Sequence, residues 1–257
     1  MEQRFLDIQD ILQQESVVDL ETQQKLGGFY TKAHEGINLL IQLIYFIPAI
    51  PVDESAERNY FSYVHSWFYM SPYTFRACIL LLSRGYYFEA SLLNRNLIEV
   101  LGKMHYFLNH KEELRKLENV ESIKTGKPKM NFKTMFDEVF PGFYQEYRIS
   151  SHIAHGGIGA RLMKIKYNSS TDIKADTGVF YNEWRATSIT NNFIVYFLGY
   201  LRFYKKLFPD IVDKLPPDIK QSFIEIDNWF EKNIHEHVEL KGGENEWHRA
   251  VKPIWNI

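Results

Sequence analysis

The sequence contains little cysteine, no long uninterrupted apolar run and no strong excess of one charge. Its single cysteine, Cys78, excludes an internal disulfide, which fits a reducing cytoplasm. Cys78 lies in an apolar run over residues 77–82, so we expect a buried, inert thiol rather than a nucleophile. The formal net charge is −2, so composition alone does not require a nucleic acid or an anionic membrane as a partner.

Further absences concern membranes and common enzyme motifs. The most apolar window, residues 37–51, contains Asn38 and Gln42 and is broken by Pro48, so it is too short to cross a bilayer. The acidic, amphipathic first residues do not resemble a secretory signal, and we expect a soluble cytoplasmic protein. Gly-x-Gly-x-x-Gly, Walker and Gly-x-Ser-x-Gly motifs are absent, which argues against nucleotide-fold and hydrolase-fold enzymes.

The dominant positive signal is helical periodicity. Hydrophobic residues make up 45% of the 257 residues, enough for a substantial core, and they recur mostly at helical spacing. The pattern predicts an all-α, single-domain helical bundle over residues 1–257. Its parts are N-terminal helices in 1–70, motif-bearing helices in 71–157, and C-terminal helices with a tail in 180–257. Alternation near residue 165 predicts a small hairpin or irregular insertion around 160–178.

Helix positions follow from capping and helix-breaking residues. The sequence predicts helices over residues 7–14, 21–47, 54–70, 73–83, 86–109, 111–119, 132–139, 141 onwards, 180–207 and 218–239. The second helix should weaken near Gly27 and Gly28. Ser71 and Pro72 have the character of an N-cap and a first-turn proline, and therefore predict the start of the fourth helix. The tail from residue 241 should dock through its tryptophans.

Polar, chemically versatile side chains are most concentrated in residues 147–157. Because a helix advances about 100° per residue, Arg148, Ser151, His152 and His155 share one stripe, with Tyr147 at its edge. A guanidinium can hold a phosphate in a fork, and histidine changes charge near neutral pH. The stripe therefore predicts acid–base cleavage of a phosphodiester, with a ribose 2′-hydroxyl as internal nucleophile and no metal or other cofactor.

Two alternatives compete with this chemical interpretation of the stripe. Ser151 and His155 can instead satisfy backbone groups and neighbours at a helix end. A metal site is the weaker alternative, because His152 and His155 have no third ligand at a suitable spacing.

A second polar pair lies on the helix expected over residues 86–109. Arg95 and Glu99 are four residues apart, so they can pair on the face opposite the leucines. Such a pair is either exposed, and contributes little, or enclosed, and then needs other polar groups to complete it. The stripe around Arg148 could supply those groups.

In these segments the chain resembles a family of uncharacterised bacterial all-helical proteins. That family has a helix of the form Leu-Leu-x-Arg-x-x-x-Glu, here Leu92 to Glu99, and a later Tyr-x-x-x-Ser-x-x-x-His-Gly, here Tyr147 to Gly156. The resemblance implies one shared polar centre. Its members would be Arg95, Glu99, Tyr147, Ser151 and His155.

The chain also resembles, more loosely, HEPN domains, whose hallmark is an arginine, a short spacer and a histidine. Arg148 and His155 match this pattern with six residues between them. The resemblance implies a metal-independent endoribonuclease of a toxin or phage-defence system, in which Arg148 binds phosphate and His155 is the acid or base. Ser151, Tyr147, Arg95 and Glu99 would support them, with Glu99 as an alternative base.

RNA, an antitoxin or other partner protein, and a second copy of the chain in a homodimer are the partners that the HEPN resemblance implies. The rival hypothesis is a non-catalytic helical module that binds a partner protein or a small anionic ligand.

Overall fold

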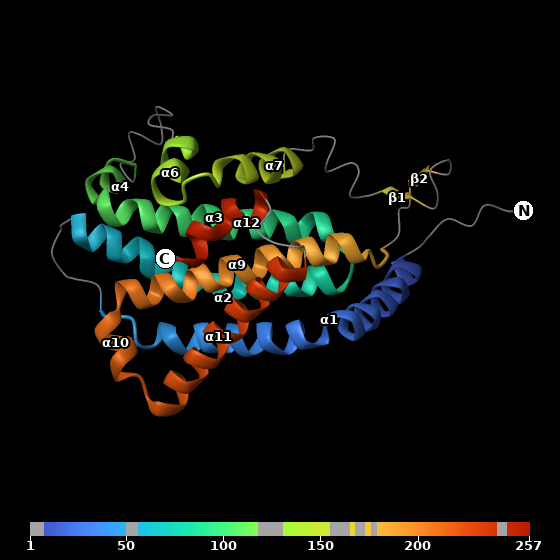
Figure 1. The fold of residues 1–257 in the computed structure, drawn as a ribbon, viewed down its shortest axis with the longest axis horizontal. Helices are drawn as coiled ribbons and strands as arrows, with labels where there is room; N and C mark the ends of the chain where they lie inside the picture. Colours follow the sequence, from blue (N-terminus) through green and yellow to red (C-terminus); the bar gives the residue numbers. More distant parts are fainter. Residues whose placement is uncertain are drawn as a thin grey trace, which may run out of the picture.

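Long helices run side by side around α9 (Glu183–Leu207), which lies at the centre of the computed structural model (Figure 1). The structure describes residues 8–49, 56–117, 131–154, 165–167, 173–175, 179–240 and 246–257. The remaining helices are α1 (Ile8–Ile44), α2 (Ala56–Ser83), α3 (Tyr87–Asn109), α4 (Lys111–Leu117), α6 (Phe132–Val139), α7 (Tyr144–Ala154), α10 (Pro209–Lys214), α11 (Pro217–Leu240) and α12 (Glu246–Trp255). The predicted all-α bundle is confirmed.

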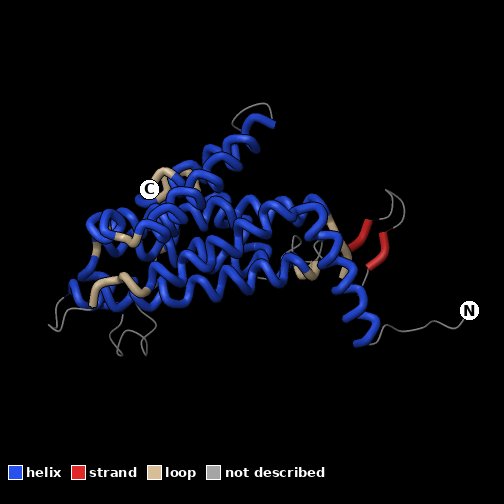
Figure 2. The backbone as a smooth tube through the Cα atoms, turned by 90° about the horizontal axis from the view of Figure 1, so that it is seen from below, coloured by secondary structure: helices blue, strands red, loops and turns tan. Residues whose placement is uncertain are grey.

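A short hairpin interrupts the helical pattern, as the sequence predicts. Strand β1 (Ile165–Tyr167) pairs antiparallel with β2 (Ile173–Ala175), and Lys166 lies opposite Lys174. The hairpin lies at the end of the molecule where α1 begins, away from the packed helices (Figures 1 and 2). Within the described ranges, no helix combines the length and apolarity needed to span a bilayer.

The predicted break between residues 14 and 21 is wrong, because α1 continues through it. Polar side chains there bond back within the helix: Ser16 Oγ donates to the Leu12 carbonyl (3.0 Å), and Thr22 Oγ1 donates to the Val18 carbonyl (2.7 Å). The helix does distort at Leu26, with φ −119° and ψ 21°, beside the predicted weak point at Gly27.

The predicted helix start at Ser71-Pro72 is also wrong, because both residues lie inside α2. Proline has no N–H, so Pro72 cannot bond to the Phe68 carbonyl four residues earlier. Ser71 Oγ donates to that carbonyl instead, at 3.1 Å. The side chain before the proline thus satisfies the group that the proline leaves free, and the helix continues.

Two helices, α10 and α12, are absent from the sequence prediction, which treats the C-terminal segment only as a docking tail. The docking itself is confirmed. Trp255 is buried, and Trp247 is half-buried, with its Nε1–H donating to Asn192 Oδ1 on α9 at 3.2 Å.

Aromatic side chains fill the core between α2, α3 and α9. The ring of Phe75 lies 5.0 Å from those of Phe193 and Phe197 and 5.3 Å from that of Tyr200. Buried tyrosines also donate to backbone carbonyls of neighbouring helices: Tyr200 to Leu97 at 3.1 Å, Tyr204 to Leu43 at 3.0 Å and Tyr60 to Met104 at 3.0 Å. Burial raises the pKa of these phenols, so they remain donors.

A glycine allows α9 to approach α3 and α12 closely. A Cβ at Gly199 would lie 2.7 Å from Leu101 Cδ2 and 2.9 Å from Ile254 Cγ2, closer than carbon atoms can pack. The exposed Gly28 of α1, in contrast, has nothing within 4 Å of a Cβ position.

We expect Gly199→Ala to destabilise the protein by about 1–3 kcal/mol through overpacking, although alanine is the better helix former. Gly28→Ala is the matched control and should be neutral or stabilising by roughly 0.5–1 kcal/mol. Urea unfolding of both variants measures the difference. A Gly199→Ala variant as stable as Gly28→Ala would contradict the close approach.

Candidate functional site

Three residues predicted from the sequence meet between α3 and α7. Arg95 Nη2 lies 2.9 Å from Glu99 Oε1 and donates to the Tyr147 hydroxyl at 3.1 Å. The Tyr147 hydroxyl in turn donates to the same Glu99 oxygen at 2.5 Å. The side chains of Arg95 and Glu99 are 20% and 18% exposed, and Tyr147 is buried. The enclosed form of the Arg95–Glu99 pair is therefore the observed one, completed by the tyrosine.

Helix α6 covers this triad (Arg95, Glu99 and Tyr147). The ring of Tyr147 lies 4.7 Å from the Phe136 ring and 5.4 Å from the Phe132 ring. Glycine at position 102 of α3 makes the approach of α6 possible, because a Cβ there would lie 2.9 Å from Met135 Cε and from a Phe136 ring carbon. The face of α3 opposite its leucines is thus packed rather than open to water.

Burial sets the protonation states around the triad. It raises the pKa of Tyr147 to about 12, with the hydrogen bond to Glu99 as the second cause, so the phenol stays a neutral donor. One turn beyond Glu99, Lys103 is half-buried with its ammonium 5.3 Å from the centre of the Phe132 ring. Burial lowers the pKa of Lys103. Lys103 is not among the residues predicted from the sequence, although its i, i+4 spacing from Glu99 continues the stripe formed by Arg95 and Glu99.

The other predicted residues of α7 lie outside the triad. Arg148 is exposed, and its Nη1 donates to Gln145 Oε1 at 3.4 Å. Ser151 is half-buried one turn after Tyr147. The His152 side chain and the whole of His155 lie outside the described residues. The structure therefore brings together Arg95, Glu99 and Tyr147, and places Arg148 at the surface beside them.

A second polar cluster, which the sequence analysis missed, joins α9 to α11 and α12. Arg202 Nε lies 3.1 Å from Asp227 Oδ1, and its Nη2 lies 3.0 Å from Glu231 Oε2. Its Nη1 donates to the Trp255 carbonyl. Burial alone would lower the pKa of Arg202, but the two carboxylates raise it above its usual value. In the sequence of α11, the two carboxylates Asp227 and Glu231 at i, i+4 spacing could have indicated a binding site for a cation such as Arg202.

Near this cluster, Lys206 of α9 contacts His105 of α3. Lys206 Nζ lies 2.8 Å from His105 Nε2, so the ammonium donates and the imidazole accepts in its neutral form. The imidazole lies against the rings of Phe203 and Phe140. Burial, and then the positive charge of Lys206, lower the pKa of His105 to about 4.

Metal-binding and thiol chemistry have little support in the part of the chain that is described. No group of three His, Cys, Asp or Glu side chains there could hold a metal ion. Cys78 is buried, with its Sγ 3.4 Å from Asn94 Oδ1, and burial raises its pKa to about 12. The prediction of an inert structural thiol is confirmed.

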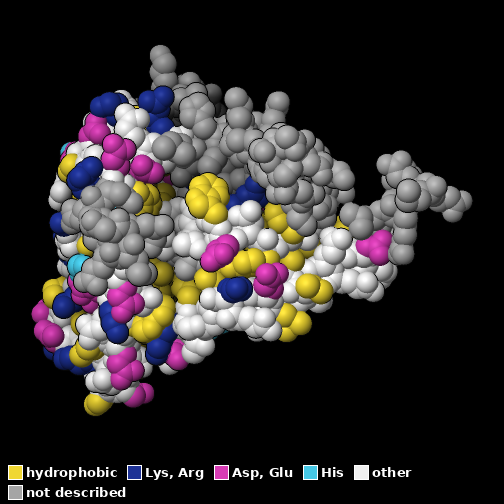
Figure 3. Space-filling model, turned by 45° about the vertical axis from the view of Figure 1, so that its right-hand side comes forward, with side chains coloured by type: hydrophobic (Ala, Val, Ile, Leu, Met, Phe, Trp, Pro, Cys, Tyr) yellow, Lys and Arg dark blue, Asp and Glu magenta, His cyan; other side chains and the backbone are white. Residues whose placement is uncertain are grey.

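On the face shown in Figure 3, acidic and basic side chains are intermixed, mostly at the left, and a few of both signs lie beside a band of apolar side chains. Recognition of an anion on this face would therefore depend on individual cations rather than on a broad positive field.

Tyr147→Phe should destabilise the protein by about 2 kcal/mol, because the partly buried Glu99 carboxylate loses a donor. Tyr144→Phe, one turn earlier on the same helix and half-buried, is the control and should change stability much less. Chemical denaturation measures the free energy of unfolding of both variants. Equal stability of both would mean that the hydroxyl of Tyr147 does not hold α7 to α3.

The lowered pKa of His105 makes stability depend on acidity. Between its ordinary value of 6.5 and about 4, the unfolded chain binds a proton that the folded protein does not, so stability falls as pH drops through this range. In His105→Phe the loss of stability between pH 7 and pH 4 should be smaller by about 3 kcal/mol. Urea unfolding across this range is the measurement, with the exposed His34→Gln as control. An unchanged slope for His105→Phe would contradict a neutral, buried imidazole.

Comparison with protein-family models, curated protein sequences and solved structures found no significant match to this chain. A functional proposal therefore depends on the geometry of the residues described above and on the motifs of the sequence.

Proposed function

We propose that the protein is HEPN-like and cleaves RNA without a metal, through Arg148 and His155. The observation that carries the proposal is the contrast between two neighbours on α7. Tyr147 is buried and bonded to Arg95 and Glu99, whereas Arg148 is exposed with one long contact to Gln145. A fixed helix thus presents a guanidinium to solvent, which suits the capture of a phosphate.

The proposed reaction is an internal transfer within the RNA strand. Arg148 holds the scissile phosphate, and His155 takes the proton from the ribose 2′-hydroxyl. The 2′-oxygen then bonds to phosphorus, and the bond from phosphorus to the 5′-oxygen of the next nucleotide breaks. The leaving 5′-oxygen takes up a proton from water, His155 returns its proton to the solvent, and a cyclic phosphate end results. Acid–base assistance of this kind contributes roughly 10²–10⁴-fold to a rate. In this proposal Ser151, one turn after Tyr147, orients the reacting groups.

Arg95, Glu99 and Tyr147 are positioning residues in this proposal. One oxygen of Glu99 already accepts hydrogen bonds from both Arg95 and Tyr147, which supports a structural role for Glu99 over that of a base. Because the triad holds α7 rather than the RNA, Tyr147→Phe should lower kcat more than it raises KM.

The second candidate is a non-catalytic module that binds a partner protein or a small anionic ligand. The hydrogen bonds that Arg95, Glu99 and Tyr147 make to one another favour it, since such a centre can fix helix packing without doing chemistry.

The partners of the proposed enzyme follow from the HEPN resemblance. They are an RNA substrate, an antitoxin or other regulatory protein, and a second copy of the chain in a homodimer, within the cytoplasm as part of a toxin or phage-defence system.

The deciding experiment is incubation of labelled RNAs with purified protein in EDTA. We expect cleavage by the wild type, a loss of roughly 10²–10⁴-fold in His155→Ala, and a loss of roughly 10²–10³-fold in Arg148→Ala, which removes a phosphate donor. Arg76→Ala, which alters an exposed arginine of α2, should cleave like the wild type. Circular dichroism checks that each variant is folded.

Equal cleavage by wild type and His155→Ala would exclude His155 as the acid or base. Cleavage by none of the proteins would favour the non-catalytic module.

A further inference from the structure

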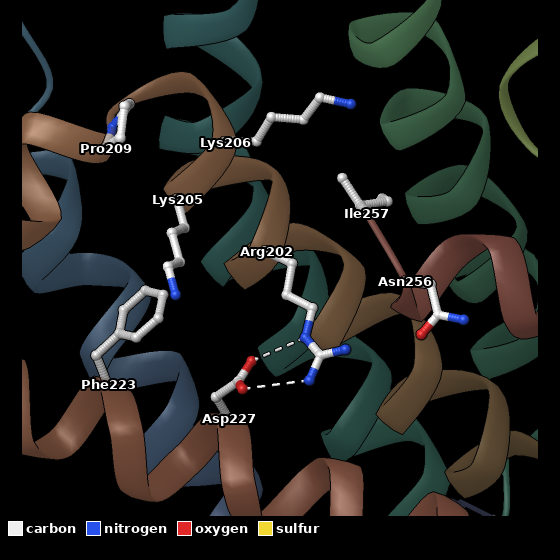
Figure 4. A pocket seen from close by; sticks show the side chains of 8 residues that line it. All are labelled: Arg202, Lys205, Lys206, Pro209, Phe223, Asp227, Asn256 and Ile257. Atoms are coloured by element: carbon white, nitrogen blue, oxygen red, sulfur yellow. Dashed lines mark hydrogen bonds and ion pairs between the residues drawn. The ribbon is translucent and has the colours of Figure 1, made fainter.

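A cavity of about 610 Å³ lies between α9, α10, α11 and the residues that follow α12 (Figure 4). Ligand-binding cavities in proteins typically measure about 300–1,000 Å³, so this one has the size for a small organic molecule. None of its lining residues belongs to the Arg95–Glu99–Tyr147 triad, which joins α3 to α7. The lining residues are Arg202, Lys205, Lys206, Pro209, Phe223, Asp227, Asn256 and Ile257.

The cations of the cavity wall differ in how far they are neutralised. Arg202 is bonded to Asp227, Glu231 and the Trp255 carbonyl, so it forms part of the wall rather than an open donor. Lys205 and Lys206 are exposed. The positive charge open to a ligand therefore belongs to the two lysines.

The side chains of Lys205 and Lys206 point in different directions from α9. In Figure 4 Lys205 extends toward the ring of Phe223, and Lys206 points away from Asp227. The ammonium of Lys206 is held by the neutral imidazole of His105 at 2.8 Å, a contact that leaves its charge uncompensated. Lys205 thus lies next to an apolar surface, where an anionic group attached to a ring could meet both features at once.

Apolar and amide groups complete the lining. Phe223 is 5% exposed, so its ring is fixed in the packing of α11. Pro209 and Ile257 add apolar surface, and the Asn256 amide offers a donor and an acceptor. The space exceeds what an inorganic anion would fill, so a ligand with an apolar body fits the site better.

We propose that this cavity binds a small organic anion, with its carboxylate or phosphate on Lys205 and its apolar or aromatic part against Phe223 and Pro209. The site is separate from the surface of Arg148 and does not depend on RNA cleavage.

Calorimetric titration of the full chain with four probes tests the proposal. Phenyl phosphate and benzoate carry both a ring and a charge, benzyl alcohol carries only the ring, and inorganic phosphate carries only the charge. We expect the first two to bind with Kd values of roughly millimolar or below, and each of the others at least about tenfold more weakly. The stronger of the two charged probes identifies the head group as phosphate or carboxylate.

Two variants locate the binding. Lys205→Gln should weaken the better charged probe by about tenfold, the loss of one ionic contact. Lys25→Gln, which changes an exposed lysine of α1 outside the cavity, should bind as the wild type does. Lys205 is exposed, so its variant should fold normally, and a melting curve verifies this. Any of three results would overturn the proposal. Benzyl alcohol could bind as tightly as benzoate, Lys205→Gln could bind the charged probe as the wild type does, or neither charged probe could bind at millimolar concentration.

Discussion

Helix α9 is buried along most of its length, and this burial constrains the rest of the structure. Its buried side chains include Phe193, Phe197, Tyr200 and Tyr204, so the surrounding helices must supply partners for both the rings and the hydroxyls. An unpaired phenol in such a core would cost free energy, and the carbonyls of α1 and α3 remove that cost. The position of α3, and with it that of Arg95 and Glu99, is thereby fixed.

Two polar regions differ in how completely they are satisfied. In the triad between α3 and α7 each of the three side chains bonds to the other two, although the buried Arg95 Nε has no partner among the described residues. At the cavity, Arg202 bonds to two carboxylates and a carbonyl, whereas Lys205 and Lys206 are exposed. Cations that bond to carboxylates hold elements in place, whereas exposed cations without a carboxylate partner can bind anions. For this reason the proposed anion-binding functions involve Arg148 and Lys205.

The sequence predicts the helical class, the hairpin and the Arg95–Glu99 pair, because these follow from local spacing. It fails where a side chain substitutes for a backbone partner: Ser71 satisfies the carbonyl freed by Pro72, so a helix continues through an expected start. Local spacing also does not reveal which of two adjacent residues on α7 is buried. Tyr147 faces α3, whereas Arg148 faces solvent. The cavity depends on α9, α11 and α12 meeting in space, and no single segment carries that information.

In the proposed function the protein cleaves RNA through a ribose 2′-hydroxyl held near Arg148 and His155. The most direct measurement compares an RNA with a DNA strand of the same sequence, both incubated with the wild-type protein in EDTA. We expect cleavage of the RNA to fragments with cyclic phosphate ends, and an intact DNA strand, because DNA lacks the internal nucleophile. Equal cleavage of both strands, or an RNA that remains intact, would contradict the proposal.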